Sequence, residues 1–173
     1  MKLNILKKIS YLFLSLALIT SFTSCEPEES VAADSPLVLQ EVMGSYWIIA
    51  LEADGETPAY GGEYNKFGFY NSGANDMSFW LDDYGAWMEL KAKSTIDLNS
   101  LTFSSEANTD ELITGGTVTI TNGKITENSY TTASGSVVDE IYFEAEFDWD
   151  PGYTYVFKGH KSTGIIADNH PSF

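Results

Sequence analysis

The sequence predicts an all-β protein, an up-and-down antiparallel β-barrel of about eight strands. Short runs of residues alternate between apolar and polar, and turns rich in Gly, Asn and Asp separate them at fairly even spacing. No long stretch has the apolar spacing of a helix. A two-sheet sandwich would also fit, but consecutive hairpins with short turns close naturally into a barrel, which we therefore favour.

The first half of the domain supplies four predicted strands. Val42–Leu51 is apolar on both faces, which is typical of a well-covered strand. Tyr64–Tyr70 alternates and places its two Phe on one face, and Met77–Leu81 follows after a polar turn. Ala86–Lys93 alternates strictly, so a half-buried strand is expected there.

The second half contains the strongest hairpin signal, Asn122-Gly123, which predicts a tight turn between strands 117–121 and 124–128. Residues 104–116 are expected to form a polar loop, and the tail 162–173 is expected to be frayed. The remaining predicted strands are Leu98–Phe103, Val137–Phe147 and Tyr153–Lys161.

The amino-terminal segment has the order of a secretory signal. Three Lys precede the short apolar stretch Tyr11–Ile19, and small residues then lead to Cys25, the only cysteine. The stretch is too short for an ordinary membrane span. Small residues followed by Cys resemble the bacterial lipobox, in which the cysteine is acylated. We therefore predict a lipoprotein signal peptide at 1–24, a lipidated tether at 25–36 and a β-barrel domain at 37–173. A plain secretory peptide cut elsewhere is the alternative.

An acidic run, Glu26–Glu29, follows the predicted lipidation site. It resembles the signal that sends lipoproteins to the cell surface in one Gram-negative phylum, although a solvated tether would also be acidic. The expected location is thus the outer membrane, with the protein anchored through Cys25 and exposed at the cell surface. A periplasm-facing lipoprotein is the other possibility.

Composition excludes some classes of partner. The chain has 25 acidic residues against nine basic ones, a net charge of −16, and every basic residue is Lys. Nucleic acid binding is not expected, because phosphate neutralisation requires clustered cations. Arginine clamps on phosphates or carboxylates are excluded. With Cys25 lipidated there is no disulfide, so the stability must come from packing.

No catalytic constellation is recognisable, so a protein without enzyme activity is favoured over an enzyme, and we expect no cofactor and no metal. A Ser-His-Asp triad would have to use His160, and no Gly-x-Ser-x-Gly elbow is present. Two distant His residues, His160 and His170, cannot form a zinc site. The carboxylate pairs Glu144/Glu146 and Asp148/Asp150 are expected on a solvated strand face and in a turn, rather than in a glycosidase cleft or a Ca²⁺ loop.

Aromatic residues are the candidates for ligand contact. The chain contains four Trp, ten Tyr and ten Phe, more than a small core must hold. Most are expected in the core, and some at a barrel mouth where apolar walls and a few polar groups form a binding site. The named candidates are Tyr46, Trp47, Trp80, Trp87 and Tyr155.

Several segments together resemble one family. They are Phe79–Lys93, Val118–Ile125, Asp139–Glu144 and Gly159–Gly164, in that order behind the lipobox-like segment. Over about residues 40–165 the chain is similar to the lipid-binding putative hydrolases, small lipoproteins with a lipocalin-like (calycin) barrel. The resemblance implies lipid binding, but it supplies no catalytic residue.

These observations favour a lipid-anchored barrel that binds a small hydrophobic or amphipathic ligand. A surface module for glycan binding or adhesion is the first alternative, and it would need an exposed flat row of Trp and Tyr. A weak esterase-like hydrolase is the second, and it would need His160 or a carboxylate pair in a cleft. The oligomeric state is not predicted.

Overall fold

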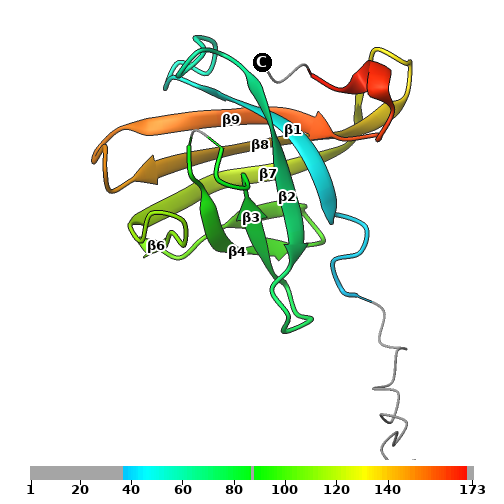
Figure 1. Cartoon of the computed structure of the whole chain (residues 1–173). Coiled ribbons are helices and arrows are strands. Elements are labelled where there is room, and N and C mark those ends of the chain that lie inside the picture. Colours follow the sequence, from blue (N-terminus) through cyan, green and yellow to red (C-terminus); the bar gives the residue numbers. More distant parts are fainter. Residues whose placement is uncertain (1–36, 87, 171–173) are drawn as a thin grey trace, which may run out of the picture. The chain divides into compact units, whose positions relative to one another are not determined.

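The computed structural model describes residues 37–86 and 88–170, and within them it contains nine strands and one short 3₁₀ helix (Figure 1). A compact unit begins at Leu37. The elements are β1 (Gly44–Leu51), β2 (Tyr64–Asn71), β3 (Ser78–Asp82), β4 (Lys91–Asp97), β5 (Thr102–Ser104), β6 (Thr109–Asp110), β7 (Thr117–Thr131), β8 (Val137–Phe147), β9 (Thr154–Lys161) and η2 (Ile166–Asp168).

The strands close into a barrel. In the described residues they form one antiparallel sheet in the order β5-β4-β3-β2-β1-β9-β8-β7-β6, and β5 also pairs with β7. That last pairing, Thr102 with Lys124 and Phe103 with Gly123, joins the two ends of the sheet. The closed ring contains eight strands, and β6 is added outside it. The predicted fold class, an all-β up-and-down antiparallel barrel of about eight strands, is confirmed.

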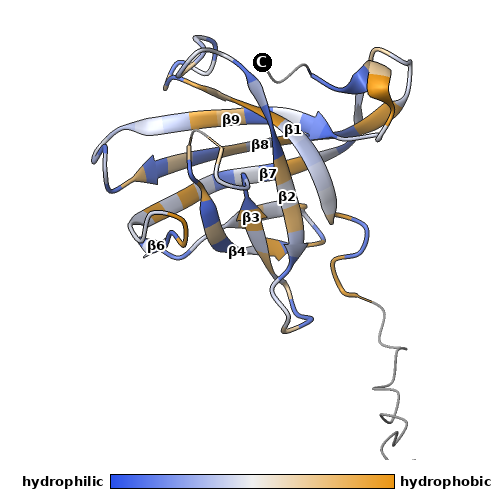
Figure 2. Ribbon diagram, in the orientation of Figure 1, coloured by the Kyte–Doolittle hydropathy of each residue, from blue (hydrophilic) through white to orange (hydrophobic). Residues whose placement is uncertain are grey.

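The barrel interior is filled by aromatic and branched side chains, because residues paired across neighbouring strands share a face. Phe143 pairs with Phe157, and Phe157 pairs with Ala50, so these three face inward together. Bands of hydrophobic and hydrophilic residues alternate along β7 and β8 in Figure 2. The inward phenylalanines are fully or almost fully buried: Phe67, Phe69, Phe79, Phe103, Phe143, Phe147 and Phe157.

The two ends of the barrel differ. Before β1, Leu39 and Val42 are buried in the core and cover one end. The other end is surrounded by the β1–β2, β3–β4, β6–β7 and β8–β9 loops, and it lies on the left in Figure 1. The residues that close the barrel and those that fill its core all lie between 37 and 170, which is what a domain needs to fold alone. No helix among the described residues is long and apolar enough to cross a membrane.

The strand predicted at Ala86–Lys93 is wrong in position. β4 runs from Lys91 to Asp97, and residues 83–86 and 88–90 are not part of a strand. Met88 and Leu90 are nevertheless buried, so the alternation of apolar and polar residues indicates which side chains are buried and does not indicate an extended backbone. Tyr84 and Glu89 have φ near +58° and +51°, which is incompatible with a regular strand.

The hairpin predicted at Asn122-Gly123 is also wrong. β7 continues through this point, and the register with β8 shifts between Thr121 and Lys124, as in a β-bulge. Asn122 has φ near +53°, and a Cβ on Gly123 would lie 2.4 Å from the ring of Phe103. Asn122 therefore supplies the left-handed residue of a bulge, and Gly123 leaves room for the ring of Phe103. The true hairpin turn lies between β7 and β8, at residues 132–136.

The other differences are smaller. β5 covers Thr102–Ser104 instead of Leu98–Phe103, and the predicted loop 104–116 contains β6. The predicted strands Val137–Phe147 and Tyr153–Lys161 are confirmed by β8 and β9. The tail is not frayed up to residue 170. Asp168 is buried and accepts hydrogen bonds from Ser134 and Thr163, so the tail is tied to the β7–β8 turn.

Candidate functional site at the barrel mouth

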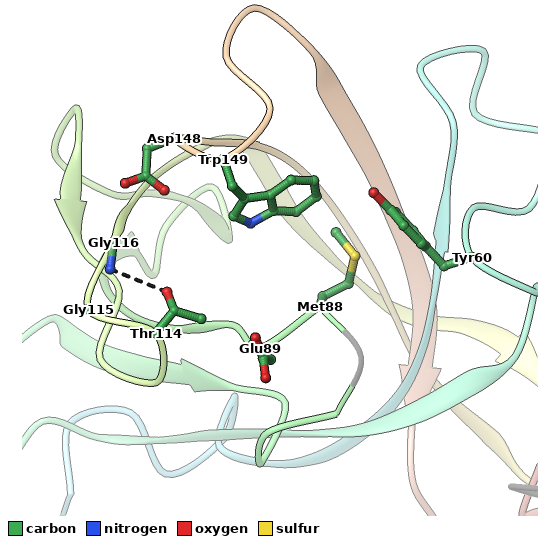
Figure 3. Close-up of a pocket in the computed structure, with 8 residues that line it drawn as sticks. All are labelled: Tyr60, Met88, Glu89, Thr114, Gly115, Gly116, Asp148 and Trp149. Carbon is green, nitrogen blue, oxygen red and sulfur yellow. Dashed lines mark hydrogen bonds between the residues drawn. The ribbon is translucent and has the colours of Figure 1, made fainter.

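A pocket of about 580 Å³ opens at the loop-bearing end of the barrel. Figure 3 shows the side chains of Tyr60 and Trp149 on its walls, with Met88 between them at the base. Four loops supply the lining, which consists of Tyr60, Met88, Glu89, Thr114, Gly115, Gly116, Asp148 and Trp149. Mouths of β-barrels are a common place for ligand sites, so this pocket is the candidate site.

Two exposed aromatic side chains form an angled wall. Tyr60 is 58% exposed and Trp149 is 46% exposed. Their ring centroids are 6.3 Å apart and their planes are inclined at 77°. Trp149 is held by stacking on Phe147, at 5.1 Å and 27°. The two rings form a corner, which suits a compact apolar group better than the flat face of a sugar.

Hydrogen bonds fix the tyrosine side of this wall. The hydroxyl oxygens of Tyr60 and Tyr155 are 3.1 Å apart, and the Tyr155 hydroxyl donates to Asp150 at 2.8 Å. Because the Tyr155 proton is engaged with Asp150, the Tyr60 hydroxyl donates to Tyr155. Burial, together with the hydrogen bonds to Tyr60 and Asp150, raises the pKa of Tyr155 well above its ordinary value. The Tyr155 hydroxyl therefore keeps its proton in the physiological range.

Glu111 shapes the opposite rim. Its carboxylate is buried and accepts hydrogen bonds from the N–H groups of Lys91, Ile113 and Thr114 and from the Thr114 hydroxyl. Burial alone would raise the pKa of Glu111, but these donors hold it below its ordinary value. A charged Glu111 therefore fastens the β6–β7 loop to the start of β4.

The pocket is acidic. Glu89 and Asp148 line it, and none of its described lining residues is basic. Lys91, the cation nearest in sequence, forms an ion pair of 2.9 Å with Asp82 instead. The whole chain is also strongly acidic. The resulting negative potential disfavours an anionic ligand group and favours a neutral or cationic one.

Beneath the pocket the interior is tightly packed. Met88 lines both the mouth pocket and a narrow gap below it. The gap has no room for a water molecule, and its other lining residues are Ile48, Ala50, Asn65, Phe67, Asp83 and Phe157. At this end of the barrel the space for a ligand therefore lies at the mouth, above Met88.

Asp83 is the unusual group of this region. It is 2% exposed, and its Oδ1 accepts a hydrogen bond of 3.0 Å from the N–H of Gly85. Its Oδ2 is buried and has no hydrogen-bond partner among the described residues. Burial raises the pKa of Asp83 to about 6; the Asp82 carboxylate adds to the shift, and backbone N–H groups, Leu90 first, oppose it. Most native buried polar groups have partners, so this oxygen requires an explanation.

Two of the proposed ligand contacts, Tyr46 and Tyr155, face the barrel interior. Tyr155 lies directly below the pocket wall, in contact with Tyr60 and 5.6 Å from Trp149. Tyr46 is fully buried near the covered end, where its hydroxyl donates to the Val42 carbonyl at 2.9 Å. Burial, with a smaller contribution from Asp139, raises the pKa of Tyr46 well above its ordinary value. The structure does not bring these two residues into one site.

The proposed tryptophan contacts lie elsewhere. Trp47 is on the outer wall between Lys66 and His160, and Trp80 is on the outer wall between Tyr70 and Lys93. Trp87 and the proposed lipidation site Cys25 lie outside the described residues. The ligand contacts proposed for the three tryptophans, and the lipid at Cys25, stay predictions.

The two histidines meet on the outer wall, away from the mouth. The Nε2 atoms of His160 and His170 are 2.9 Å apart, and Nδ1 of His160 lies 3.1 Å from the Lys161 carbonyl. His170 stacks on Tyr64 at 3.8 Å, and His160 stacks on Tyr130 at 4.1 Å. Both nitrogens of His160 are thus engaged, and neither points at a serine hydroxyl in the described residues. Nor do these residues contain a group of three or more His, Cys, Asp or Glu that could hold a metal ion.

Sequence reasoning missed most of the pocket. The five ligand contacts named from the sequence include none of Tyr60, Met88, Trp149 and Asp83. The four positions come from loops far apart in the sequence. One signal was available for Tyr60 and Trp149, because each is an aromatic residue inside a turn rich in Gly, Asp or Pro.

Comparison with known proteins gives one positive finding. A family model described as "lipid-binding putative hydrolase" matches residues 36–166, which is most of the chain and includes all nine strands of the described residues. The search of curated proteins found no match.

Proposed function

The chain belongs to the lipid-binding putative hydrolase family, and from this premise we propose that its barrel binds a small hydrophobic or amphipathic ligand at the mouth. The observation that carries the proposal is the pocket between Tyr60, Trp149 and Met88. Two exposed aromatic rings over a methionine make a contiguous apolar surface, and such exposed patches mark binding sites. The methionine is unbranched and adapts its shape to a guest.

The alternatives have less support. A glycan platform requires coplanar rings, and the Tyr60 and Trp149 rings are inclined at 77°. A hydrolase requires a base beside a nucleophile or a water site, whereas both nitrogens of His160 are engaged on the outer wall. The family description names both lipid binding and hydrolysis, and the geometry of the described residues favours the first.

The test is native mass spectrometry of residues 26–173, purified gently from cells and again after delipidation. We expect a bound small-molecule mass that disappears on delipidation. The mass of a fluorescent probe with an alkyl chain should appear in its place when that probe is added. If the gently purified protein carries no adduct and the probe does not bind, the proposal is wrong.

Matched variants locate the site. Tyr60→Ala and Trp149→Ala should each weaken probe binding by about tenfold, because each removes an aromatic contact of roughly 1 kcal/mol or more. Tyr84→Ala is the control. Tyr84 is also a loop tyrosine and is 60% exposed, but it does not line the pocket. An equal loss in all three variants would point to a general effect on the fold and not to this pocket.

We also propose that the protein is a lipoprotein of the outer membrane, anchored through Cys25 and exposed at the cell surface. The support is the order of Lys residues, apolar stretch, small residues and Cys in the first 25 positions. Metabolic labelling with an alkyne fatty acid should mark the full chain, and Cys25→Ser should abolish the label. Replacing Glu28 and Glu29 with Ala should reduce cleavage by protease added to intact cells. Unchanged cleavage would exclude the export role of the acidic run.

A further inference from the structure

The unpartnered oxygen of Asp83 lies directly below the mouth pocket. Asp83 follows the last residue of β3 and Asn65 is the second residue of β2, so both lie at the mouth end of the barrel. Both line the gap beneath Met88, among Ile48, Ala50 and Phe157. A carboxylate oxygen that is buried in a mostly apolar gap, with no hydrogen-bond partner among the described residues and no room for water, is poorly solvated. Such an oxygen is a strong acceptor for any donor that can reach it.

The side chain of Met88 separates this oxygen from the pocket. Met88 is the one described residue that lines both spaces. Methionine has three rotatable side-chain bonds and readily adopts other rotamers. A rotamer change that withdraws the thioether would join the gap to the pocket without a movement of the backbone. An ammonium or hydroxyl group, which is about the size of a water molecule, would then have space at Asp83.

The charges around the pocket restrict what can enter. Glu89 and Asp148 line the mouth, and Asp83 lies below them. A fatty acid carboxylate would meet three acidic side chains and no described basic one. An amine or alcohol on an apolar chain meets no such repulsion, and it brings the donor that Asp83 lacks.

From these observations we propose that the pocket binds an amphiphile whose polar end is a hydrogen-bond donor, a primary ammonium or a hydroxyl, with that end at Oδ2 of Asp83 and the alkyl chain between Tyr60 and Trp149. The inference rests on the proposed function and adds the ligand class and its recognition residue. The raised pKa of Asp83 is consistent with it, because burial disfavours the charged form of a carboxyl group that has no cation beside it and one unpartnered oxygen.

The test compares three ligands with the same chain length, dodecylammonium, dodecanol and dodecanoate, by isothermal titration calorimetry on residues 26–173 at pH 7.5. The ammonium and carboxylate are used below the concentrations at which they form micelles, and dodecanol is used below its solubility limit. We expect the order ammonium, alcohol, carboxylate, with at least tenfold between the first and the last.

Asp83→Asn makes the test specific. The Asn oxygen can keep the bond from the Gly85 N–H, which places its NH₂ group where the free oxygen was. A donor then replaces an acceptor, so ammonium affinity should fall at least tenfold and the preference over carboxylate should disappear or reverse. If Asp83 had only a structural role, Asp83→Asn would weaken the binding of all three ligands alike.

Non-specific attraction of cations to the acidic surface needs its own control. Asp110→Asn removes one exposed charge of β6 that lines neither the pocket nor the gap, and 0.5 M NaCl screens exposed charges. The ammonium preference should change less than threefold in either case. A preference that collapses in salt, or that survives Asp83→Asn, overturns the inference while the pocket itself stands. If none of the three ligands binds, the proposed function fails together with it.

Discussion

Substitution of Asp83 by Asn should change how the stability of the protein depends on pH. The pKa of Asp83 is raised from 3.8 to about 6 in the folded protein, chiefly by burial. Between these two values the folded state holds a proton that the unfolded state releases. The free energy of unfolding therefore falls as the pH rises through this window. This is the reverse of the usual behaviour of a paired carboxylate.

The magnitude follows from the shift. One pKa unit corresponds to 1.36 kcal/mol, so a shift of about two units lowers the stability by at most about 3 kcal/mol above pH 7. Asn resembles the protonated acid at every pH. The variant should thus gain up to about 3 kcal/mol on the wild type between pH 4 and pH 8. Its own NH₂ group lacks a partner, but that cost does not depend on pH and cancels in the comparison.

The assay is urea unfolding of residues 26–173, followed by far-UV circular dichroism at intervals from pH 4 to pH 8. The chain has 25 acidic residues, and many of them contribute to the pH dependence of the wild type. The difference between variant and wild type removes that background. A difference that stays constant across the pH range would refute the argument that Asp83 is a buried, poorly solvated acid.

The neighbouring carboxylate supplies the control. Burial would raise the pKa of Asp82, but hydrogen bonds from Tyr70 and Lys91 and the N–H of Tyr84 lower it overall. Its stabilising contribution is present above the unfolded pKa of 3.8 and is lost as the pH falls. Asp82→Asn should therefore lose stability relative to the wild type at neutral pH. The stability difference between variant and wild type should therefore change with pH in opposite directions for the two adjacent aspartates.

Three further predictions concern the core and the tail. Phe143→Ala should lower the free energy of unfolding by about 3–5 kcal/mol, because the fully buried ring stacks on Phe157 at 4.5 Å, and a loss below 1 kcal/mol in urea unfolding would contradict this. Burial, and the nearby His160, lower the pKa of His170 below 6.5, so the unfolded tail takes up a proton more readily; the hydrogen-exchange protection factors of residues 162–170, which correct for the intrinsic pH dependence of exchange, should fall as the pH falls from 7.5 to 5. His170→Phe, which can still stack on Tyr64, should abolish that loss of protection. Asp168→Ala should expose the same segment to limited proteolysis and leave the far-UV spectrum of the barrel unchanged, since it removes the hydrogen bonds to the β7–β8 turn; a tail that stays protected would mean that other contacts hold it.

Most of the barrel could be predicted from the sequence because a strand with one buried face alternates with period two. β8 has the bounds that its alternation predicted. The same signal misplaced β4, since Met88 and Leu90 are buried from a loop and not from a strand. The Asn122-Gly123 pair misled for a related reason. A bulge and a hairpin turn both require a left-handed residue, and the pairing of β7 with β8 and β5 distinguishes them.

The pocket could not be predicted in the same way. Its walls, Tyr60 and Trp149, come from two loops that meet only when β1 and β9 pair. The sequence indicates that the Asp82-Asp83 pair is polar, but not which carboxyl faces inward. The structure decides it: Asp82 lies beside Lys91 on the outer face, and Asp83 comes after the strand has ended, above Phe157.

Asp83 therefore links stability and binding. A buried, ionised carboxylate with one unpartnered oxygen destabilises the folded barrel, and a ligand that donates a hydrogen bond to that oxygen reduces the penalty when it binds. The complex then lacks a penalty that the ligand-free protein carries. A ligand with an ammonium or hydroxyl group should therefore raise the unfolding midpoint of the wild type more than that of Asp83→Asn. Relative to its own stability at pH 4, the variant should lose less stability at neutral pH than the wild type does, and it should be the less selective binder. This trade-off is expected when a strained group is kept for recognition, and it would be hard to explain if Asp83 served only the fold.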